Sequence, residues 1–302
     1  MDLWHPRNLA GYGRLPPAPQ WPGNTRLALQ FVLNVEEGAE RTILNGDSGS
    51  ENYLPELPGA QQYEGQRNYS AESLFDYGAR VGFWRILRLF EQRQLPLTAF
   101  ACGLALELNP DAGAALAELG HEVAGHGYRW IDYRQVDEAT ERDHIRRTRR
   151  IIEETTGTAP VGWYTGRVSA NTRKLLVETG GLLYDSDAYD DELPYWLTEA
   201  GLSHLVIPYS LITNDIRYVT APGCTTAEDF YTLLRDAFDL LWTEGQDSPR
   251  MMSVGLHSRF SGHPARAPAI ARFLDHVAEH DGVWVCRRRE IAEHWYRTIA
   301  SV

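Results

Sequence analysis

Short apolar runs alternate along this chain with longer segments in which apolar residues recur at helical spacing. Seven of the short runs predict buried strands, at residues 26–34, 97–103, 121–126, 161–166, 182–187, 251–258 and 282–288. Two further extended pieces are expected at residues 204–210 and 215–220. Because strands that alternate with helices usually form a parallel sheet, the pattern predicts an α/β fold that is either barrel-like or doubly wound.

Three segments carry the helical pattern most clearly. Ser70 is the predicted N-cap of a helix over residues 70–94. The apolar positions of this helix that we expect to face the core are Leu74, Tyr77, Val81, Trp84, Leu87 and Phe90. Two more helices are predicted over residues 137–157 and 227–245.

Two segments show neither the short apolar runs of strands nor the helical spacing of apolar residues. Residues 1–24 are rich in Pro and Gly around LPPAPQWPG, so we expect an arm that lies on the body of the protein or on a neighbouring chain. We assign residues 25–302 to one domain. Residues 36–69 have no clear periodicity, and a loop of that length more often forms a lid or a binding element than a simple connection.

Composition excludes some classes of partner. The chain has 302 residues, 43% of them hydrophobic, which is enough for a large core. Its formal net charge of -12 argues against a nucleic-acid surface or an anionic membrane, because both need concentrated Lys and Arg. The one basic cluster, at residues 146–150, lies among acidic residues in a helical pattern and is interpreted as a solvated helix face.

The cysteines and the apolar runs bear on the cellular compartment. Cys102, Cys224 and Cys286 are odd in number and widely separated, so we interpret them as reduced thiols. The first residues, MDLWHPRNLAGYG, do not resemble a signal peptide, and no apolar run approaches the length of a membrane span. We therefore expect a cytoplasmic protein.

Polar residues follow the predicted strands at positions that a parallel barrel would bring to one rim. These residues are Glu36, Glu37, His126, Arg167, Asp185, Asp187 and His257. Each has an ordinary structural explanation. Paired glutamates at a strand end are usually a solvated turn, and aspartates often form turns. His126 and His257 differ from the other histidines because both end apolar strands at the same predicted rim.

The remaining histidines are given structural interpretations. His121 opens a strand and is expected to hydrogen-bond locally. Lone histidines such as His204, His263, His280 and His294 are interpreted as surface or internally satisfied residues.

The order of these motifs resembles the NodB-homology or polysaccharide deacetylase superfamily, carbohydrate esterase family 4. The resemblance implies an irregular seven-stranded (β/α) barrel. In that family the first acid of a pair is a general base, the second binds a metal, and an H-x-x-x-H motif supplies two more ligands, while a late Leu-His supplies a general acid. These roles would fall on Glu36, Glu37, residues 126–130 and His257.

Two departures from the family motif change the expected chemistry. The acidic pair is Glu-Glu, and H-x-x-x-H becomes HGYRW, with Trp130 at the second ligand position. A catalytic zinc ordinarily has three protein ligands, and an indole N–H can donate a hydrogen bond but cannot bind a cation. The sequence therefore predicts a converted metal site, with no metal and no other cofactor.

Longer strings resemble the metal-independent allantoinases within this superfamily. They are LNVEEGAE, SLFDYGARVGFWRIL, GHGYRWIDY, PVGWYTGR, LYDSDAYDDELPYW, HLVIPY and GLHSR. The resemblance implies a hydrolase of a small cyclic ureide, allantoin being opened to allantoate in purine catabolism, and a homo-oligomer, often a tetramer. Cyclic imide hydrolases share the subgroup and stay an alternative, because Val35, Ala71 and residues 168–171 depart from the allantoinase strings.

The resemblance and the residues together suggest a mechanism. Glu36 would be the base, with its pKa raised by burial beside Glu37, and His257 the general acid. Hydrogen-bond donors would replace the metal in polarising the carbonyl, and the candidates are Trp130, Arg167, His126 and backbone N–H groups.

The remaining candidates would position groups or contact the substrate. Asp185 and Asp187 would orient His257 or Arg167, or bind substrate N–H groups, with Asn34 as a helper. Two rival functions stay open at this point, a true polysaccharide deacetylase and a non-catalytic binding protein.

Overall fold

The computed structural model describes residues 7–54, 56, 61–199 and 202–299. Within them one curled, mostly parallel sheet has the order β6-β7-β5-β4-β3-β2-β1-β8, and β9 also pairs with β1. The strands are β1 (Leu27–Val35), β2 (Thr98–Ala101), β3 (Glu122–Gly125), β4 (Gly162–Trp163), β5 (Tyr184–Asp185), β6 (Tyr195–Glu199), β7 (Leu202–Val206), β8 (Arg250–His257) and β9 (Val283–Val285). This is an irregular half-barrel, and it confirms the predicted fold class.

All seven predicted strands are present, and the two extra extended pieces have different outcomes. Residues 204–210 overlap β7, which forms an antiparallel hairpin with β6, a strand that the sequence analysis missed. The prediction for residues 215–220 is wrong, because a 3-10 turn, η5 (Asp215–Tyr218), occupies this stretch. The Asn214 side chain accepts a hydrogen bond from the backbone N–H of Ile216 and so caps the turn.

Strand β1 pairs with three other strands, and all nine of its residues are buried. It pairs with β8 along its length, so that Asn34 lies opposite His257. Its other edge is shared, with β9 beside residues 27–29 and β2 beside residues 32–35. Because the paired strands run parallel, the carboxyl ends of β1, β2, β3 and β8 meet at one edge.

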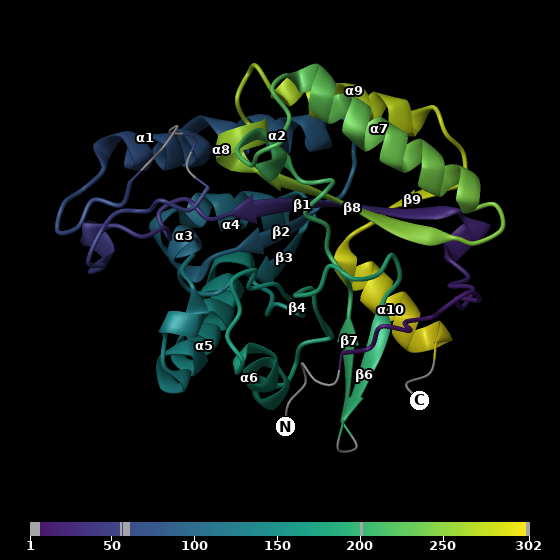
Figure 1. The fold of residues 1–302 in the computed structure, drawn as a ribbon, viewed down its shortest axis with the longest axis horizontal. Coiled ribbons are helices and arrows are strands. Elements are labelled where there is room, and N and C mark those ends of the chain that lie inside the picture. The colour runs from purple at the N-terminus through teal and green to yellow at the C-terminus, as the bar shows by residue number, and fades with distance from the viewer. Residues whose placement is uncertain (1–6, 55, 57–60, 200–201, 300–302) are drawn as a thin grey trace.

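Helices cover both faces of the sheet (Figure 1). They are α1 (Tyr69–Tyr77), α2 (Phe83–Glu91), α3 (Gly103–Leu108), α4 (Pro110–Glu118), α5 (Glu138–Thr156), α6 (Thr172–Thr179), α7 (Ala227–Glu244), α8 (Ser258–Ser261), α9 (Ala267–Ala278) and α10 (Arg288–Thr298). In this view α1, α2, α7, α8 and α9 lie above the sheet, α3 and α4 lie to its left, and α5 and α6 lie at the lower left. Short 3-10 turns occur at η1 (Pro22–Asn24), η2 (Ile43–Asn45) and η4 (Tyr133–Gln135).

Helices α5 and α7 confirm the predictions for residues 137–157 and 227–245. Asp137 caps α5, and Gly157 ends it in the left-handed conformation at φ 75°. The basic cluster on α5 lies on an exposed face, where Arg146 contacts Asp143 and Arg147 contacts Glu107, both at 3.2 Å. This confirms its interpretation as a solvated helix face.

The helix predicted over residues 70–94 is interrupted by a π-helical turn, η3 (Gly78–Gly82). Its N-cap is Asn68 rather than Ser70, because the Asn68 side chain accepts from the N–H of Ala71. The predicted core face is also partly wrong, since Val81 is exposed while Gly82 is buried. Glycine is required there: a Cβ at Gly82 would lie 2.0 Å from the carbonyl oxygen of Ser258.

The described part of the N-terminal arm packs on the body of the protein. The Trp21 side chain is buried, and its indole N–H donates to the carbonyl of Arg250 at 3.0 Å. The Tyr12 hydroxyl donates to the carbonyl of Pro194 at 2.6 Å. Whether the arm also contacts a neighbouring chain stays a prediction.

The structure shows the state of the three cysteines and the character of the described helices. Cys102, Cys224 and Cys286 are all buried and unpaired. Of the helices formed by the described residues, none is both long and apolar enough to cross a membrane.

The contact between η3 and α8 gives a first testable prediction. On helix propensity alone, Gly82→Ala would stabilise the protein by about 1 kcal/mol. We expect the opposite, a loss of about 1–3 kcal/mol in the free energy of unfolding, because the new methyl group would meet the Ser258 carbonyl. Urea denaturation measures it, with Val81→Ala on the exposed neighbour as a control expected within about 0.5 kcal/mol of the parent. Unchanged or increased stability of Gly82→Ala would contradict the close approach.

Candidate active site

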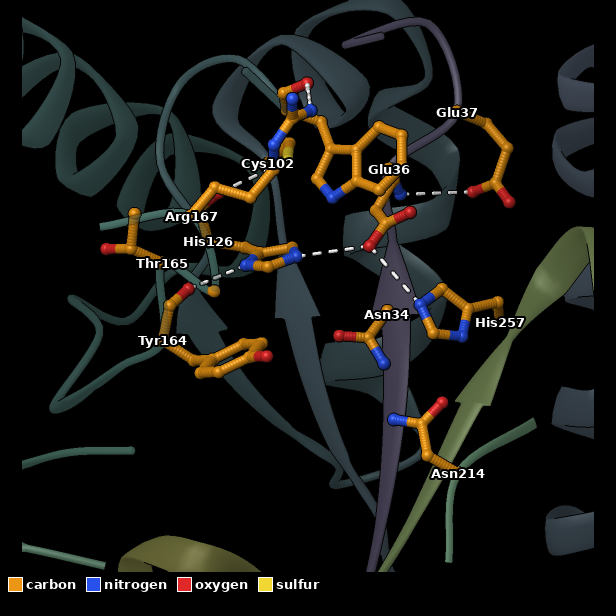
Figure 2. Close-up of polar contacts among 12 residues, drawn as sticks. Asn34, Glu36, Glu37, Cys102, His126, Tyr164, Thr165, Arg167, Asn214 and His257 are labelled. Carbon is orange, nitrogen blue, oxygen red and sulfur yellow. Dashed lines mark hydrogen bonds and ion pairs between the residues drawn. The ribbon is translucent and has the colours of Figure 1, made fainter. Parts of the chain in front are cut away.

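The carboxylate of Glu36 is the centre of the site, and Glu36 is the first residue after β1. Its Oε1 lies 3.2 Å from Nε2 of His126 and 3.4 Å from Nε2 of His257. Its Oε2 accepts a hydrogen bond from Nη1 of Arg259 at 2.7 Å. Figure 2 shows the two imidazoles on opposite sides of this carboxylate. The predicted convergence of the ends of β1, β3 and β8 is thus what the structure shows for these residues.

His257, the last residue of β8, is held from behind by Asp215. Its Nδ1 lies 2.6 Å from Oδ1 of Asp215, and its backbone N–H donates to Oδ2 at 2.7 Å. The N–H of Ser261 donates to the same Oδ2 at 3.1 Å, so the Asp215 carboxylate is fixed from three directions. Because a carboxylate only accepts, Nδ1 of His257 carries a proton, and Nε2 points at Glu36.

These two carboxylates set the charge of the His257 ring. Burial is the largest single influence and would lower the pKa of His257, but the negative charges of Glu36 and Asp215 and their hydrogen bonds outweigh it. The net result raises this pKa to about 9. At neutral pH the ring is therefore an imidazolium, which is the form that a general acid needs.

Arg259, on the short helix α8, is a fully buried cation. Its guanidinium carbon lies 4.5 Å from the centre of the Phe75 ring, 5.1 Å from that of Trp130 and 4.4 Å from that of Phe260. Within the described residues, its Nε and Nη2 have no hydrogen-bond partner. Aromatic faces attract cations, so this cage compensates part of the missing hydration and aims the remaining donor, Nη1, at Glu36.

Glu37 shares the burial of Glu36 but not its contacts. Its Oε2 accepts from the backbone N–H of Glu36 at 3.1 Å, while its Oε1 lies 4.0 Å from Nη1 of Arg259. Figure 2 shows its carboxyl group turned back toward that N–H. The position also depends on Gly78, where a Cβ would lie 2.5 Å from Oε1 of Glu37.

The pKa values of the two glutamates shift in opposite directions, and the shift of Glu36 is opposite to the prediction. Burial acts most strongly on Glu36 and would raise its pKa, but the charges of Arg259 and His257, and hydrogen bonds from both histidines, hold it well below its usual value. Burial, and then the charge of Glu36, raise the pKa of Glu37 against the opposing charge of Arg259. The expectation of a raised pKa for Glu36 is therefore wrong, because it took account of Glu37 and not of Arg259.

His126 follows β3 and is used at both ring nitrogens. Its Nδ1 donates to the carbonyl of Tyr164 at 2.6 Å, since a carbonyl can only accept, and this directs Nε2 at Glu36. The ring also stacks on Tyr164, with centroids 5.1 Å apart and planes at 12°. His126 thus faces Glu36 with little freedom to turn.

Trp130 lies between two guanidinium groups. Arg259 approaches its ring to 5.1 Å and Arg167 to 5.3 Å, while its backbone carbonyl accepts from Nη1 of Arg167 at 3.3 Å. Its indole Nε1 has no hydrogen-bond partner in the part of the chain that the structure describes. The residue that stands where the family has a metal ligand is therefore a packing surface for two cations with one free N–H donor.

Arg167 connects the site to the long loop after β1. Its guanidinium lies over the Tyr53 ring at 4.7 Å and 3.8 Å from Oε2 of Glu51. The same loop is anchored to the end of β3, since the Trp130 N–H donates to the carbonyl of Ala39 at 2.9 Å. The described part of the loop therefore packs beside the site, as a binding element would.

Asp185 and Asp187 lie in a separate buried cluster. Asp185 contacts Nε of Arg173 and Nε2 of His204, both at 2.7 Å. Asp187 accepts hydrogen bonds from the N–H groups of Thr165, at 2.9 Å, and Gly166, at 2.7 Å, and so fixes the loop that carries Arg167. The carboxylate that orients His257 is Asp215, so the suggestion that Asp185 or Asp187 does this is wrong.

The two aspartates also differ in charge. Burial is the largest single influence on the pKa of both aspartates, and it raises both values. The charge of Arg173 and the hydrogen bond from His204 overcome it at Asp185, whose pKa is lowered. Burial and the neighbouring charge of Asp185 raise the pKa of Asp187 to about 7, despite its backbone hydrogen bonds.

Asn34 closes the lower side of the site. Its Nδ2 donates to the Tyr209 hydroxyl and to the carbonyl of Leu256, both at 3.1 Å. Figure 2 shows the amide oxygen directed to the side of the site where His126 and Tyr164 lie. That oxygen is the group that Asn34 can offer to a ligand N–H.

The residues around the acidic pair do not fit a catalytic metal. His126 is the one histidine at that position, Trp130 offers no lone pair, and the guanidinium of Arg259 already supplies the positive charge beside both glutamates. The donor chemistry thus agrees with the predicted conversion of the family's metal site.

Two site residues were missed in the sequence. Arg259 follows His257 by two positions in the string LHSRF, and Asp215 lies in a stretch interpreted as extended. The signal for Arg259 was a lone basic residue next to a catalytic candidate at a buried strand end. Asp215 gave no comparable signal, because its contact with His257 spans 42 positions.

Comparison with known proteins places these residues in context. A family model described as polysaccharide deacetylase matches residues 66–181. A protein of Schizosaccharomyces pombe, named as a candidate polysaccharide deacetylase, is 41% identical over 97% of this chain and 98% of its own.

Two solved structures resemble the whole chain. PuuE allantoinase is 51% identical, with a TM-score of 0.96 and 99% of each chain covered. A probable polysaccharide deacetylase from Pseudomonas aeruginosa PAO1 is 52% identical, with a TM-score of 0.96, covering 99% of this chain and 100% of its own.

The buried pair of Arg259 and Glu36 gives a prediction about stability. Arg259→Met should lower the free energy of unfolding by about 3–5 kcal/mol, because it leaves a buried carboxylate without its countercharge. Arg93→Met, which breaks an exposed pair with Asp275 at 2.8 Å, is the control and should cost at most about 1 kcal/mol.

A double-mutant cycle separates charge from packing. Glu36→Gln added to Arg259→Met should recover part of the loss, because the uncompensated charge is removed with its partner. Denaturant unfolding of the four proteins measures the coupling, and strictly additive losses would show that the two side chains do not interact.

Proposed function

The chain belongs to the polysaccharide deacetylase family, and on that premise we propose that it is a hydrolase that opens the ring of a small cyclic amide, with allantoin as the preferred candidate. One observation carries the proposal. The Glu36 carboxylate and the His257 imidazolium form an acid–base pair whose countercharge is the guanidinium of Arg259. The likeness to PuuE allantoinase over the whole chain supports the substrate class.

Hydrolysis begins with a water molecule beside Glu36. The water oxygen attacks the ring carbonyl carbon, a C–O bond forms, and the water proton passes to Oε1 of Glu36. Because Arg259 lowers the pKa of Glu36, this carboxylate is a weak base. Its contribution is position and full ionisation rather than high basicity, since it is fixed by contacts on both oxygens.

His257 completes the reaction. When the C–N bond breaks, the departing ring nitrogen takes the proton from Nε2 of His257. The same Nε2 lies 3.4 Å from Oε1 of Glu36, so the proton that Glu36 received returns to His257 and restores both groups. Asp215 keeps the imidazolium in place throughout.

The developing negative charge on the carbonyl oxygen needs donors. The free indole N–H of Trp130 and the Arg167 guanidinium are our candidates, and one such donor is typically worth about a hundredfold in rate. Asn34 and Asp187 are the candidates for holding ring N–H groups. Both oxygens of Asp185 accept hydrogen bonds from Arg173 or His204, so its role in this proposal is to hold those two side chains.

Burial favours a small ring over a polymer. Glu36 is 1% exposed and His257 4% exposed, so a substrate must place its reacting carbonyl inside the protein, which suits a compact molecule better than the middle of a glycan chain. An imide or ureide is also more easily opened than an unactivated acetamide, which suits a site without a metal. The cytoplasmic location, the role in purine catabolism and the homo-oligomeric state stay predictions.

The function is tested with metal-depleted protein. Chelator-treated protein, assayed for bound metal, should open allantoin, with succinimide and hydantoin measured in parallel. Glu36→Gln should stay folded, although less stable because Arg259 loses its buried partner, and should bind substrate but lose turnover about a hundredfold or more. Turnover of imides alone would move the function to cyclic imide hydrolysis, and release of acetate from an acetylated glycan would overturn the proposal.

The raised pKa of His257 predicts the pH dependence. The protonated fraction of His257 falls as pH rises, so kcat/KM should decline above about pH 9. Asp215→Asn removes one of the charges that raise this pKa, so the decline should move to lower pH and turnover should fall about a hundredfold or more. Asp275→Asn, on the surface pair with Arg93, is the control. An alkaline limit that stays in place in Asp215→Asn would show that Asp215 does not act through His257.

A further inference from the structure

A second cluster of metal-binding side chains lies where α7 and α9 pack together, apart from the acid–base pair. These helices run side by side over the sheet (Figure 1). Asp239 projects from α7, His276 from α9, and His280 follows the end of α9. One ligand atom from each of the three residues lies within 4.8 Å of the other two.

The distances suit a small cation. Nε2 of His276 lies 2.7 Å from Oδ1 of Asp239, and the two imidazole centroids are 4.6 Å apart. Ligand atoms around a tetrahedral zinc ion are separated by roughly 3.4 Å, given bond lengths of about 2.0–2.2 Å. Bringing the three atoms to that separation requires only small side-chain rotations.

His280 is prepared for coordination by its other nitrogen. Its Nδ1 lies 2.9 Å from the carbonyl of His276, and because a carbonyl only accepts, Nδ1 must donate. Its Nε2 therefore keeps a lone pair. A histidine that donates one ring N–H to a carbonyl and presents the other nitrogen is the arrangement found around protein-bound metals.

Aromatic neighbours restrict both rings. Phe238 packs edge-on against His276, at a centroid distance of 5.6 Å, and against His280, at 5.1 Å. Trp242 contacts His280 in the same manner at 5.1 Å. These contacts reduce the conformational entropy that the side chains would lose on binding an ion.

We propose that Asp239, His276 and His280 bind one divalent transition-metal ion of the zinc type, which links α7 to α9. Two imidazoles and one carboxylate suit Zn²⁺ and its neighbours, whereas Ca²⁺ and Mg²⁺ prefer all-oxygen sites. The Asp239 side chain is 45% exposed, which leaves room for a water as fourth ligand. Because the cluster shares no residue with the acid–base pair, the proposal is independent of the proposed function.

The test uses the full chain, free of any affinity tag and stripped with chelator. Titration with ZnCl₂ in a calorimeter should give one site per chain, and saturating Zn²⁺ should raise the melting temperature by a few degrees. His276→Asn and His280→Asn should each weaken Zn²⁺ binding about tenfold or more and remove the thermal shift. His263→Asn, on an exposed loop, is the control and should bind like the parent.

Each other outcome overturns the proposal. Binding of Zn²⁺ that is equal in the parent, His276→Asn and His280→Asn would locate the ion elsewhere, and loss in Glu37→Gln instead would locate it at the acidic pair. Absence of binding by the parent would reduce the cluster to a surface hydrogen bond. Without metal, the ring-opening activity of His276→Asn and His280→Asn should equal that of the parent, so failure of this proposal is distinguishable from failure of the proposed function.

Discussion

The ion pair between Arg259 and Glu36 is the interaction on which the rest of the site depends. A carboxylate with 1% exposure would ordinarily take up a proton, and an uncharged Glu36 could neither attract a water proton nor keep His257 charged. The guanidinium at 2.7 Å prevents this. In turn Glu36 and Asp215 hold His257 as a cation, so one buried positive charge keeps Glu36 ionised and, through Glu36, favours the protonated form of His257.

The same pair bears on the predicted conversion of the family's metal site. A metal at such a site supplies positive charge at a defined position. Here the charge comes from a side chain, and the aromatic rings of Phe75, Trp130 and Phe260 keep the guanidinium in place. Trp130 therefore does more than replace a potential metal ligand, because its ring packs against the guanidinium of Arg259.

The sequence predicted those features that depend on local patterns. Apolar runs located all seven expected strands, and the alternation with helices implied that their ends would share an edge, which brought Glu36, His126 and His257 together. Contacts between distant segments were beyond such patterns. The core face near Val81 was misjudged because the backbone of Gly82 approaches Ser258, and the pKa of Glu36 was misjudged because Arg259 reaches it from 223 positions away.

The pairing of β1 with β8 has a consequence for how each molecule folds after synthesis. The base candidate follows β1 and its acid partner ends β8, so a ribosome must synthesise and release the whole of the chain between them before the two strands can meet. Contacts with such sequence separation form slowly and late. Until then β1, whose nine residues are all buried in the folded protein, has no neighbour on that edge, and an unpaired strand edge favours aggregation of the newly made protein.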